Sequence, residues 1–292
     1  MSNSNLRLSK SDLLDMVSAI MGAVDQKSVH PGLVFARVDI DDKAVEMTAL
    51  DLEIQVVIRK SFDTPTGFSQ KKSFCLPVKK IYDFIRALSD EEYLQLSVDE
   101  EHKKITVQAS HCRIEVAAYN PQDFPQFEVS KPDSEFYVDS QELKNIIDAI
   151  SFSMAQSDIR YYLNGMLWDA LDDKLVCVAT DGHRMALSSV AIDRVGLYSE
   201  TTTNQPNIQQ AVIIPRRAIF ELNKLLSARP SRLKVGLSRS LMNIQFDDIS
   251  FTSKLIDGKF PDYSRVIPRE HGEKLVMSKE QLKNALVQVQ PV

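Results

Sequence analysis

Residues 6–24 read LRLSKSDLLDMVSAIMGAV, and the same pattern returns at residues 136–154 as FYVDSQELKNIIDAISFSM. Residues 275–289 give a third and shorter version, LVMSKEQLKNALVQV. In each version a short apolar stretch runs into a capping box and then into an amphipathic segment, which predicts a strand that leads into a helix. The capping boxes pair Ser9 with Asp12, Asp139 with Glu142, and Ser278 with Gln281. Because the copies lie much further apart than the units of a solenoid, they indicate a duplicated domain.

Two further pairs of landmarks follow in the same order. FCLPVKKIYDFIRAL (74–88) matches VIIPRRAIFELNKLL (212–226), and NPQDFPQF (120–127) matches LIDGKFPDY (255–263). Ordered landmarks at nearly constant spacing predict two complete copies and the opening of a third. We place the first domain at residues 1–129, the second at 130–268 and the incomplete start of the third at 269–292.

Each copy alternates the signals of strands and helices. In the first copy, residues 12–24 and 79–88 have the spacing of amphipathic helices. Residues 33–40 and 45–58 have the Val and Ile content of strands, and the second copy repeats this order. The polar segment 194–210 is expected to be a surface loop. We therefore expect an α+β fold in which each copy packs two helices on antiparallel sheets.

Composition limits the possible functions. The net charge of −5 means that the surface as a whole repels nucleic acid, so a role on DNA requires a local basic face. No apolar run is long enough to span a bilayer or to act as a secretion signal. The three cysteines, Cys75, Cys112 and Cys177, are widely spaced and are expected to be reduced cytosolic thiols. Neither the cysteines nor the five histidines have the spacing of metal ligands, so we expect no metal and no cofactor.

The second helix of each copy begins with a pair of basic residues. These residues are Lys79 and Lys80 in the first copy and Arg216 and Arg217 in the second. One interpretation is an ordinary charged face in contact with water. The other is a concave basic lining that contacts DNA phosphates without reading the base sequence, if the repeats are arranged around a common axis.

The most distinctive string is ATDGHRMA, residues 179–186. Asp181 with His183 suggests acid–base chemistry, but no nucleophile elbow or phosphate-binding glycine loop accompanies them. Asp181-Gly182 is instead typical of a hairpin turn, which would place His183 and Arg184 at the rim of a binding site. The corresponding segment of the first copy, ALDLE at residues 49–53, lacks Gly-His-Arg. A feature found in one copy alone is a candidate for a specialised function.

A second string, RYYLNG at residues 160–165, places Arg160 beside Tyr161 and Tyr162. A basic residue next to two tyrosines could stack on unpaired bases. The same string also suits a structural segment whose aromatic side chains alternate between core and surface. The residues alone leave both possibilities open.

Four segments together resemble the bacterial DNA polymerase III beta subunit family, the sliding clamps. They are RYYLNGML (160–167), VATDGHRMALSS (178–189), IIPRRAIFELNKLL (213–226) and FTSKLIDGKFPDYSRVIP (251–268). The resemblance covers nearly the whole chain and is strongest from residue 160 to residue 268. It implies a DNA-clamp fold with three similar domains per subunit, and two subunits closed head to tail into a ring around duplex DNA. It also implies a non-catalytic protein that tethers the replicative polymerase and raises its processivity. The implied location is the cytoplasm, at the nucleoid.

The family resemblance further implies a cleft for short peptides. Its expected partners are the polymerase III alpha subunit, the clamp loader, other polymerases and repair proteins. Carried over by motif, the cleft residues are Leu163, Thr180, Gly182, His183, Arg184, Met185, Pro261, Arg265 and Val266. The residues that match family positions for DNA contact are Lys27, Arg160, Tyr161 and Tyr162. Met185 stands where Leu is commoner in the family.

One departure from the family pattern suggests an alternative function. The family has a complete third copy, whereas this sequence stops at Val292, just inside it. That copy would supply the other wall of the cleft and half of the ring interface. The alternative is therefore a truncated, clamp-like peptide-binding module that cannot close a ring on DNA. A third hypothesis is a cytosolic enzyme that uses Asp181 and His183.

Overall fold

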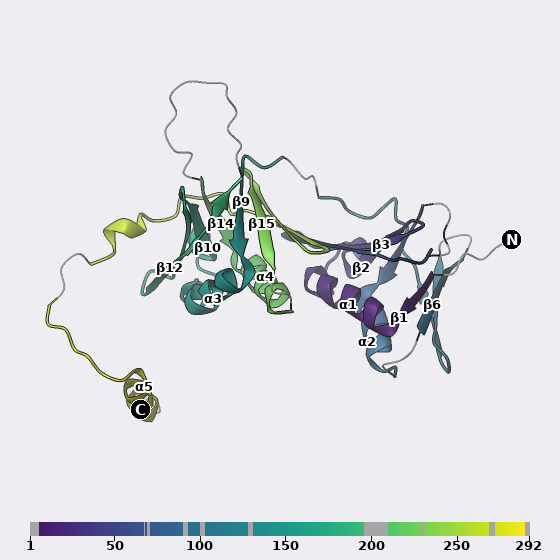
Figure 1. The fold of residues 1–292 in the computed structure, drawn as a ribbon, viewed down its shortest axis with the longest axis horizontal. Helices are drawn as coiled ribbons and strands as arrows, with labels where there is room; N and C mark the ends of the chain where they lie inside the picture. The colour runs from purple at the N-terminus through teal and green to yellow at the C-terminus, as the bar shows by residue number, and fades with distance from the viewer. Residues whose placement is uncertain are drawn as a thin grey trace, which may run out of the picture. The chain divides into compact units, whose positions relative to one another are not determined.

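The computed structural model describes residues 6–66, 68, 71–89, 93–99, 103–127, 131–195, 210–228, 231–268 and 272–289. The chain folds as two compact units, Met1–Phe260 and Pro261–Val292. Both complete copies of the repeat lie in the first unit (Figure 1). The limits that we place on the individual domains stay a prediction.

The first copy contains two helices and eight strands among the described residues. In chain order they are β1 (Leu6–Ser9), α1 (Lys10–Ile20), β2 (Phe35–Ile40), β3 (Ala44–Leu50), β4 (Ile54–Ser61), β5 (Lys72–Pro77), α2 (Val78–Arg86), β6 (Tyr93–Val98), β7 (Lys104–Gln108) and β8 (Arg113–Ala117). Two short 3₁₀ turns, η1 (Met21–Ala23) and η2 (Pro31–Val34), lie between α1 and β2.

The second copy repeats this order with one additional short strand, β13. Its elements are β9 (Ser134–Asp139), α3 (Ser140–Ile150), η3 (Ser151–Ser153), η4 (Tyr161–Leu163), β10 (Gly165–Ala170), β11 (Lys174–Thr180), β12 (Met185–Ala191), β13 (Asp193–Arg194), β14 (Gln210–Pro215), α4 (Arg216–Ala228), β15 (Arg232–Leu237), β16 (Leu241–Phe246) and β17 (Ile249–Lys254). The matching order confirms the predicted α+β repeat. Most of the loop expected at 194–210 lies outside the described residues.

The N-cap residues of the two predicted capping boxes, Ser9 and Asp139, cap the first helices as the sequence predicts. The Ser9 hydroxyl accepts a hydrogen bond from the backbone N–H of Asp12 at 3.0 Å and donates to its carboxylate at 2.6 Å. In the second copy, the Asp139 carboxylate accepts from the backbone N–H groups of Gln141 and Glu142. Each cap satisfies amide groups that the first turn of a helix leaves without a partner, and typically contributes about 1 kcal/mol.

One expectation about the strands is wrong in detail. Residues 45–58, expected as a single strand, form the two strands β3 and β4. Between them the Asp51 carboxylate accepts hydrogen bonds from the N–H groups of Glu53 and Ile54, both at 2.7 Å. An aspartate that binds the backbone two and three residues ahead closes a tight turn, which reverses the chain despite the high strand propensity on both sides.

The strands form three sheets, and one sheet joins the two copies. The first copy contributes the sheet β1-β6-β7-β8, and the second copy contributes β12-β11-β10-β14. The third sheet has nine strands in the order β13-β9-β15-β16-β17-β4-β3-β2-β5. Its two halves meet where β17 pairs antiparallel with β4, in a register that sets Ile249 opposite Ile58 and Ser253 opposite Ile54. All four long helices of the first unit lie on one side of this sheet (Figure 1).

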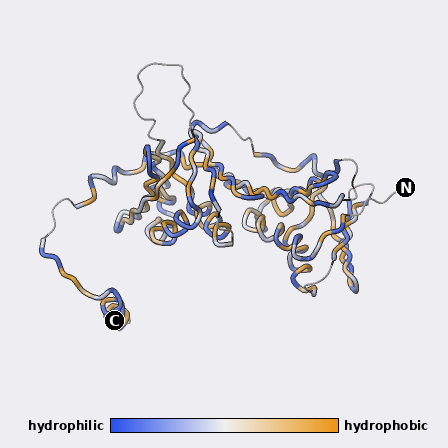
Figure 2. Tube along the Cα trace, in the orientation of Figure 1, coloured by the Kyte–Doolittle hydropathy of each residue, from blue (hydrophilic) through white to orange (hydrophobic). Residues whose placement is uncertain are grey.

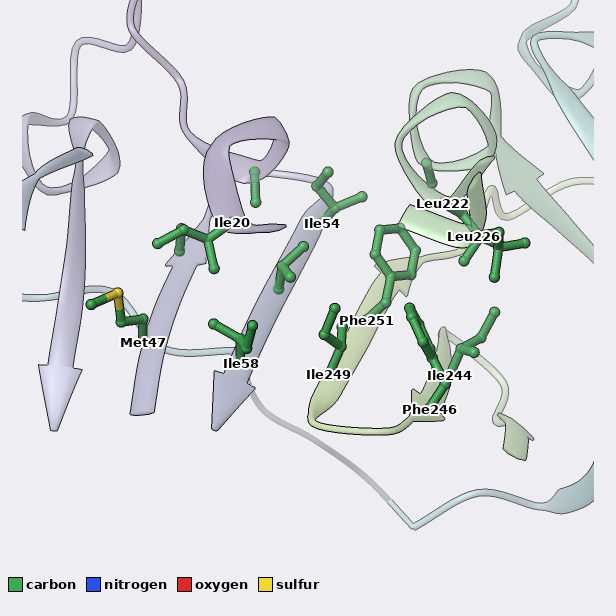
Figure 3. Packing of buried hydrophobic residues seen from close by; sticks show 14 of the residues in the cluster. Ile20, Met47, Ile54, Ile58, Leu222, Leu226, Ile244, Phe246, Ile249 and Phe251 are labelled. Atoms are coloured by element: carbon green, nitrogen blue, oxygen red, sulfur yellow. The ribbon is translucent and has the colours of Figure 1, made fainter. Parts of the chain in front are cut away.

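The core continues across this junction without a break. Phe251 of β17 is fully buried, as are Ile54 and Ile58 of the neighbouring strand. In Figure 3, Phe251 lies between Ile54 and Ile58 of β4 on one side and Leu222 and Leu226 of α4 on the other. Fully burying a side chain of this size contributes about 1.5–3 kcal/mol. The two copies therefore share one large hydrophobic cluster within the compact unit Met1–Phe260.

The second unit contains η5 (Tyr263–Arg265) and α5 (Lys279–Val289). As predicted, α5 is amphipathic, with Leu282, Leu286 and Val289 at helical spacing, but none of its residues is buried. A hydrophobic stretch precedes it (Figure 2), in which Leu275 and Val276 are almost fully exposed. Among the described residues, no helix is both long and apolar enough to cross a membrane.

Candidate peptide cleft and basic helix face

The turn at residues 181–184 is built around the Asp181 carboxylate. One of its oxygens accepts from the N–H groups of His183 and Arg184, both at 2.9 Å, and the other accepts from Arg184 Nε at 3.0 Å. Thr180 closes the turn from the other side: its hydroxyl donates to the Arg184 carbonyl and accepts from the Gly182 N–H. This arrangement presents the side chains of His183 and Arg184 to solvent.

Gly182 is required by the geometry of this turn. Its φ of +88° lies in the region that favours glycine, and a Cβ at this position would lie 3.0 Å from the guanidinium nitrogens of Arg160. The sequence signal Asp-Gly therefore correctly predicted a reversal of the chain between β11 and β12.

Arg160 links this turn to the neighbouring segment η4. Its guanidinium donates to the Asp158 carboxylate at 2.9 and 3.0 Å and to the Asp181 carbonyl at 3.2 Å. Asn164 holds the same segment, since its side chain accepts from the Asp158 N–H and donates to the Asp158 carbonyl, both at 2.9 Å. Leu163, at the end of η4, is 1% exposed. The RYYLNG and ATDGHR strings therefore form one connected network.

The loop after β17 packs against the same segment. A Cβ at Gly258 would lie 3.1 Å from the Cβ of Tyr162 and 3.2 Å from the ring of Tyr161. The glycine thus allows the backbone to approach both tyrosines closely. Tyr161 remains 57% exposed, whereas Tyr162 is half-buried.

The structure places six of the nine predicted cleft residues in the first unit. Leu163 is buried, Thr180 and Met185 are half-buried, and Gly182, His183 and Arg184 are exposed. The other three, Pro261, Arg265 and Val266, belong to the second unit. There Arg265 forms an ion pair with Asp262 at 2.9 Å, and Val266 is 61% exposed. That these three residues complete the cleft stays a prediction.

Two carboxylates of this network have depressed pKa values. Hydrogen bonds from the side chain and the backbone N–H of Arg160 lower the pKa of Asp158 to about 2. Hydrogen bonds from the backbone N–H groups of Arg184 and His183 lower the pKa of Asp181 to about 2. Both groups are therefore ionised at neutral pH and act as hydrogen-bond acceptors.

The arrangement argues against an Asp–His acid–base pair. The two oxygens of Asp181 bind backbone amides and Arg184, and no hydrogen bond joins them to the His183 ring among the described contacts. A catalytic dyad requires the carboxylate to orient the imidazole directly. Asp181 acts instead as the cap of a turn.

The basic residues divide into two groups with different surroundings. Lys79 and Lys80, in the first turn of α2, are exposed and form no ion pair within the described residues. Lys27, in the loop after η1, is also exposed. Their ammonium groups face water, as contact with a phosphate requires.

The arginines of α4 bind protein groups. Arg216 donates to the Met154 carbonyl at 2.9 Å, and its guanidinium lies 4.8 Å from the centroid of the Phe220 ring. Arg217 forms an ion pair with Asp51 at 2.6 Å, from the second copy of the repeat to the first. Asp51 is 4% exposed. No local pattern in the sequence predicts this contact; the one signal is that both turns carry an aspartate, Asp51 in the first copy and Asp181 in the second.

Within the described residues, no cluster of His, Cys, Asp and Glu could hold a metal ion. Cys75 and Cys177 are buried, and Cys112 is exposed. Burial raises the pKa of the Cys75 thiol to about 12 and raises the pKa of the Cys177 thiol as well. Both thiols are therefore protonated and unreactive at neutral pH.

Two repeats that share one sheet, with their helices on one side of it, define the class: an α+β repeat protein. Comparison with known proteins makes this class specific. The family model for the N-terminal domain of the DNA polymerase III beta subunit matches residues 4–128, and the model for its central domain matches residues 137–262. The chain belongs to the DNA polymerase III beta subunit family, the beta sliding clamps.

Individual relatives agree with this assignment. The beta sliding clamp of Pseudomonas aeruginosa is 32% identical over 274 residues, which cover 94% of this chain and 70% of that protein. The clamp of Vibrio cholerae is 30% identical over 278 residues, or 95% of this chain and 72% of that protein. A crystal structure of the Pseudomonas aeruginosa clamp bound to griselimycin superposes with a TM-score of 0.87 at 30% identity, covering 98% of this chain and 74% of that one.

Proposed function

We propose that this chain is the subunit of a sliding clamp that encircles duplex DNA and tethers the replicative polymerase to it. The observation that carries the proposal is the pairing of β17 with β4, which joins one repeat to the next through the backbone. The counterparts of these two strands, β8 and β12, stand at the ends of the other two sheets. The same antiparallel pairing can therefore extend from one chain to another and close a head-to-tail ring, as in a homodimer of full-length subunits.

DNA contact in this proposal is electrostatic and independent of sequence. Lys27, Lys79 and Lys80 are exposed, and contact with phosphates needs only positive charge. Arg160, Tyr161, Tyr162, Arg216 and Arg217 remain proposed DNA-contact residues, although the arginines also bind protein groups. The acidic net charge then keeps DNA away from the outer surface.

The second part of the proposal is a peptide cleft beside η4 and the 181–184 turn. Apolar peptide side chains would bind beside Leu163 and Met185, and in the full cleft beside Val266. Thr180, His183 and Arg184 would orient the peptide backbone. The proposed partners are the polymerase III alpha subunit, the clamp loader, other polymerases and repair proteins. In this role the protein catalyses no reaction and acts in the cytoplasm, at the nucleoid.

Retention on circular DNA tests the ring. The salt concentration is set at the value that removes the Lys79→Glu/Lys80→Glu variant from non-specific DNA. At this salt, clamp loaded onto nicked circular plasmid is expected to stay bound. It is expected to dissociate once the plasmid is linearised. Lys104→Glu/Lys174→Glu carries the same charge change at exposed strand positions and serves as the control. Light scattering across a dilution series gives the solution mass. A monomer at every concentration, or equal loss from circular and linear DNA, contradicts ring closure by this chain.

Peptide binding tests the cleft separately. His183→Ala is expected to weaken binding of a polymerase-derived peptide while the chain remains folded, with exposed Ser189→Ala as the control. The truncated-module alternative has less support than the clamp, because both repeats match the clamp family over most of their length, at residues 4–128 and 137–262. A turnover reaction abolished by His183→Ala, with peptide binding intact, would refute the non-catalytic proposal.

A further inference from the structure

A groove lies between the two repeats, away from the 181–184 turn. Its volume is about 630 Å³. The first repeat contributes Leu33, Leu50, Leu52 and Phe127, and the second contributes Leu241 and Leu255. Both walls belong to the compact first unit, and the β17–β4 pairing holds them together.

The groove repeats the construction of the proposed peptide cleft. Leu33 lies in η2, the counterpart of η4, where Leu163 lies. Leu50 precedes the Asp51 turn as Thr180 precedes the Asp181 turn, and Asp51 accepts backbone N–H groups in the same way as Asp181. The segment Phe124-Pro125, next to Phe127, corresponds to Phe260-Pro261 in the sequence repeat. Duplication has therefore produced a second apolar hollow at an equivalent position.

The apolar surface of the groove has a floor and an open rim. Leu33 and Leu50 are 2% and 3% exposed and form the floor. Leu52 is 70% exposed, although it lies at a turn where a polar residue would be expected. Phe127, Leu241 and Leu255 are half-buried along the sides. A concave surface with buried and half-buried apolar residues is suited to one or two apolar side chains of a ligand.

The charges around the groove favour an acidic ligand. Lys254 is exposed, its Nζ lies 5.2 Å from the centroid of the Phe127 ring, and it forms no ion pair within the described part of the chain. The one acidic residue among the lining side chains, Asp51, is neutralised by Arg217. The groove therefore has a net positive end at Lys254, directly beside its aromatic wall.

We propose that this inter-repeat groove is a second peptide site, which binds a short extended segment of a partner protein with two apolar side chains and an acidic residue at Lys254. The ligand class, an extended peptide, rests on the proposed function of the cleft in the second repeat. The site itself rests on the groove, its exposed leucine and its uncompensated lysine. A clamp with two sites per subunit could hold one partner at two points, or two partners at once.

Methyl NMR on the full chain tests the proposal, with the peptide acetyl-Leu-Asp-Phe-Leu-Gly-Ser-amide as the probe. Addition of the peptide is expected to shift the methyl resonances of Leu33, Leu52 and Leu241. Leu52→Glu is expected to weaken this binding at least tenfold; Leu52 is exposed enough for the change to leave the fold intact. Val276→Glu, at a position that is 98% exposed in the second unit, is the matched control. Lys254→Glu is expected to weaken binding of the Asp-containing peptide about three- to fivefold. The same variant is expected to prefer a peptide in which Lys replaces the Asp.

A variant of the cleft at the 181–184 turn distinguishes binding at the two sites. In His183→Ala the groove methyl groups should still respond, which supports the second site even if the first cleft fails. Shifts confined to Leu163 and Met185 overturn the second site and leave the proposed function standing. Methyl shifts that follow the concentration of the chain without peptide identify a second copy as the occupant and overturn the proposal, as does an absence of shifts in the groove at millimolar peptide.

Discussion

Replacing Arg217 by Met should destabilise the junction between the repeats. The substitution removes the guanidinium 2.6 Å from Asp51 Oδ2 and keeps most of the apolar part of the side chain. The other carboxylate oxygen would remain bound to the two backbone N–H groups of the turn. Asp51, however, is 4% exposed, so its second oxygen would become a charged atom with neither water nor a protein partner.

The expected cost follows from the burial of the two partners. Breaking a fully buried ion pair costs about 3–5 kcal/mol. Here the Arg217 side chain is 45% exposed, and solvent screens its interaction, so we expect about 2 kcal/mol. For a unit of this size that free energy lowers Tm by about 4–8 °C.

A double-mutant cycle in urea measures the pair directly. Arg217→Met and Asp51→Asn should each reduce the free energy of unfolding, and the double variant should lose less than their sum, with a coupling free energy of about 1 kcal/mol or more. Lys224→Met on the same helix is the control, because the ion pair of Lys224 with Glu221 leaves the lysine 69% exposed. If Arg217→Met is no less stable than the control, the ion pair does not hold the repeats together.

Four further outcomes follow from the described contacts. Because the folded pKa of Asp181 lies below its usual value of 3.8, its contribution to stability is present above pH 3.8 and is lost as the pH falls toward about 2. As the pH falls across this range, the urea midpoint should therefore decrease less steeply in Asp181→Asn than in the unchanged chain. Equal slopes for the two proteins would exclude Asp181 as the cause. Gly182→Ala should lower Tm and weaken peptide binding, since φ is positive there and a Cβ would lie 3.0 Å from the guanidinium nitrogens of Arg160. A thiol reagent should label Cys112 rapidly and the two buried cysteines only on unfolding; early labelling of all three would mean that the core opens readily. Phe251→Ala should cost about 3–5 kcal/mol in urea unfolding, and a cost below 1 kcal/mol would show that the junction is not closely packed.

The sequence predicted the parts of the fold that depend on local chemistry. The capping boxes at Ser9 and Asp139 begin helices where expected, because a cap needs only residues within one turn. Asp181-Gly182 forms the predicted turn for the same reason. The turn at Asp51 was not predicted, because the strongly apolar residues on both sides of it favour one continuous strand.

Contacts between distant residues could not be predicted in this way. The pairing of β17 with β4 depends on which sheet edges meet after folding, and no local pattern encodes it. The same is true of the partners of Arg216 and Arg217, which the sequence presented only as positive charges at the start of a helix. For the cleft, the motifs identified Leu163 and the 181–184 turn, but Arg160 joins them through contacts that only the structure reveals.

The backbone pairing at the β17–β4 junction has an evolutionary consequence. Hydrogen bonds between strands use the amide groups that nearly every residue possesses, so the two repeats can exchange most surface side chains without losing their alignment. The exposed positions at a junction of this kind can drift while the junction persists, which is compatible with the 30–32% identity to two known beta sliding clamps. Gene duplication in such a protein therefore copies a groove whose shape is defined by the backbone. Later substitutions need only change which ligand each groove binds.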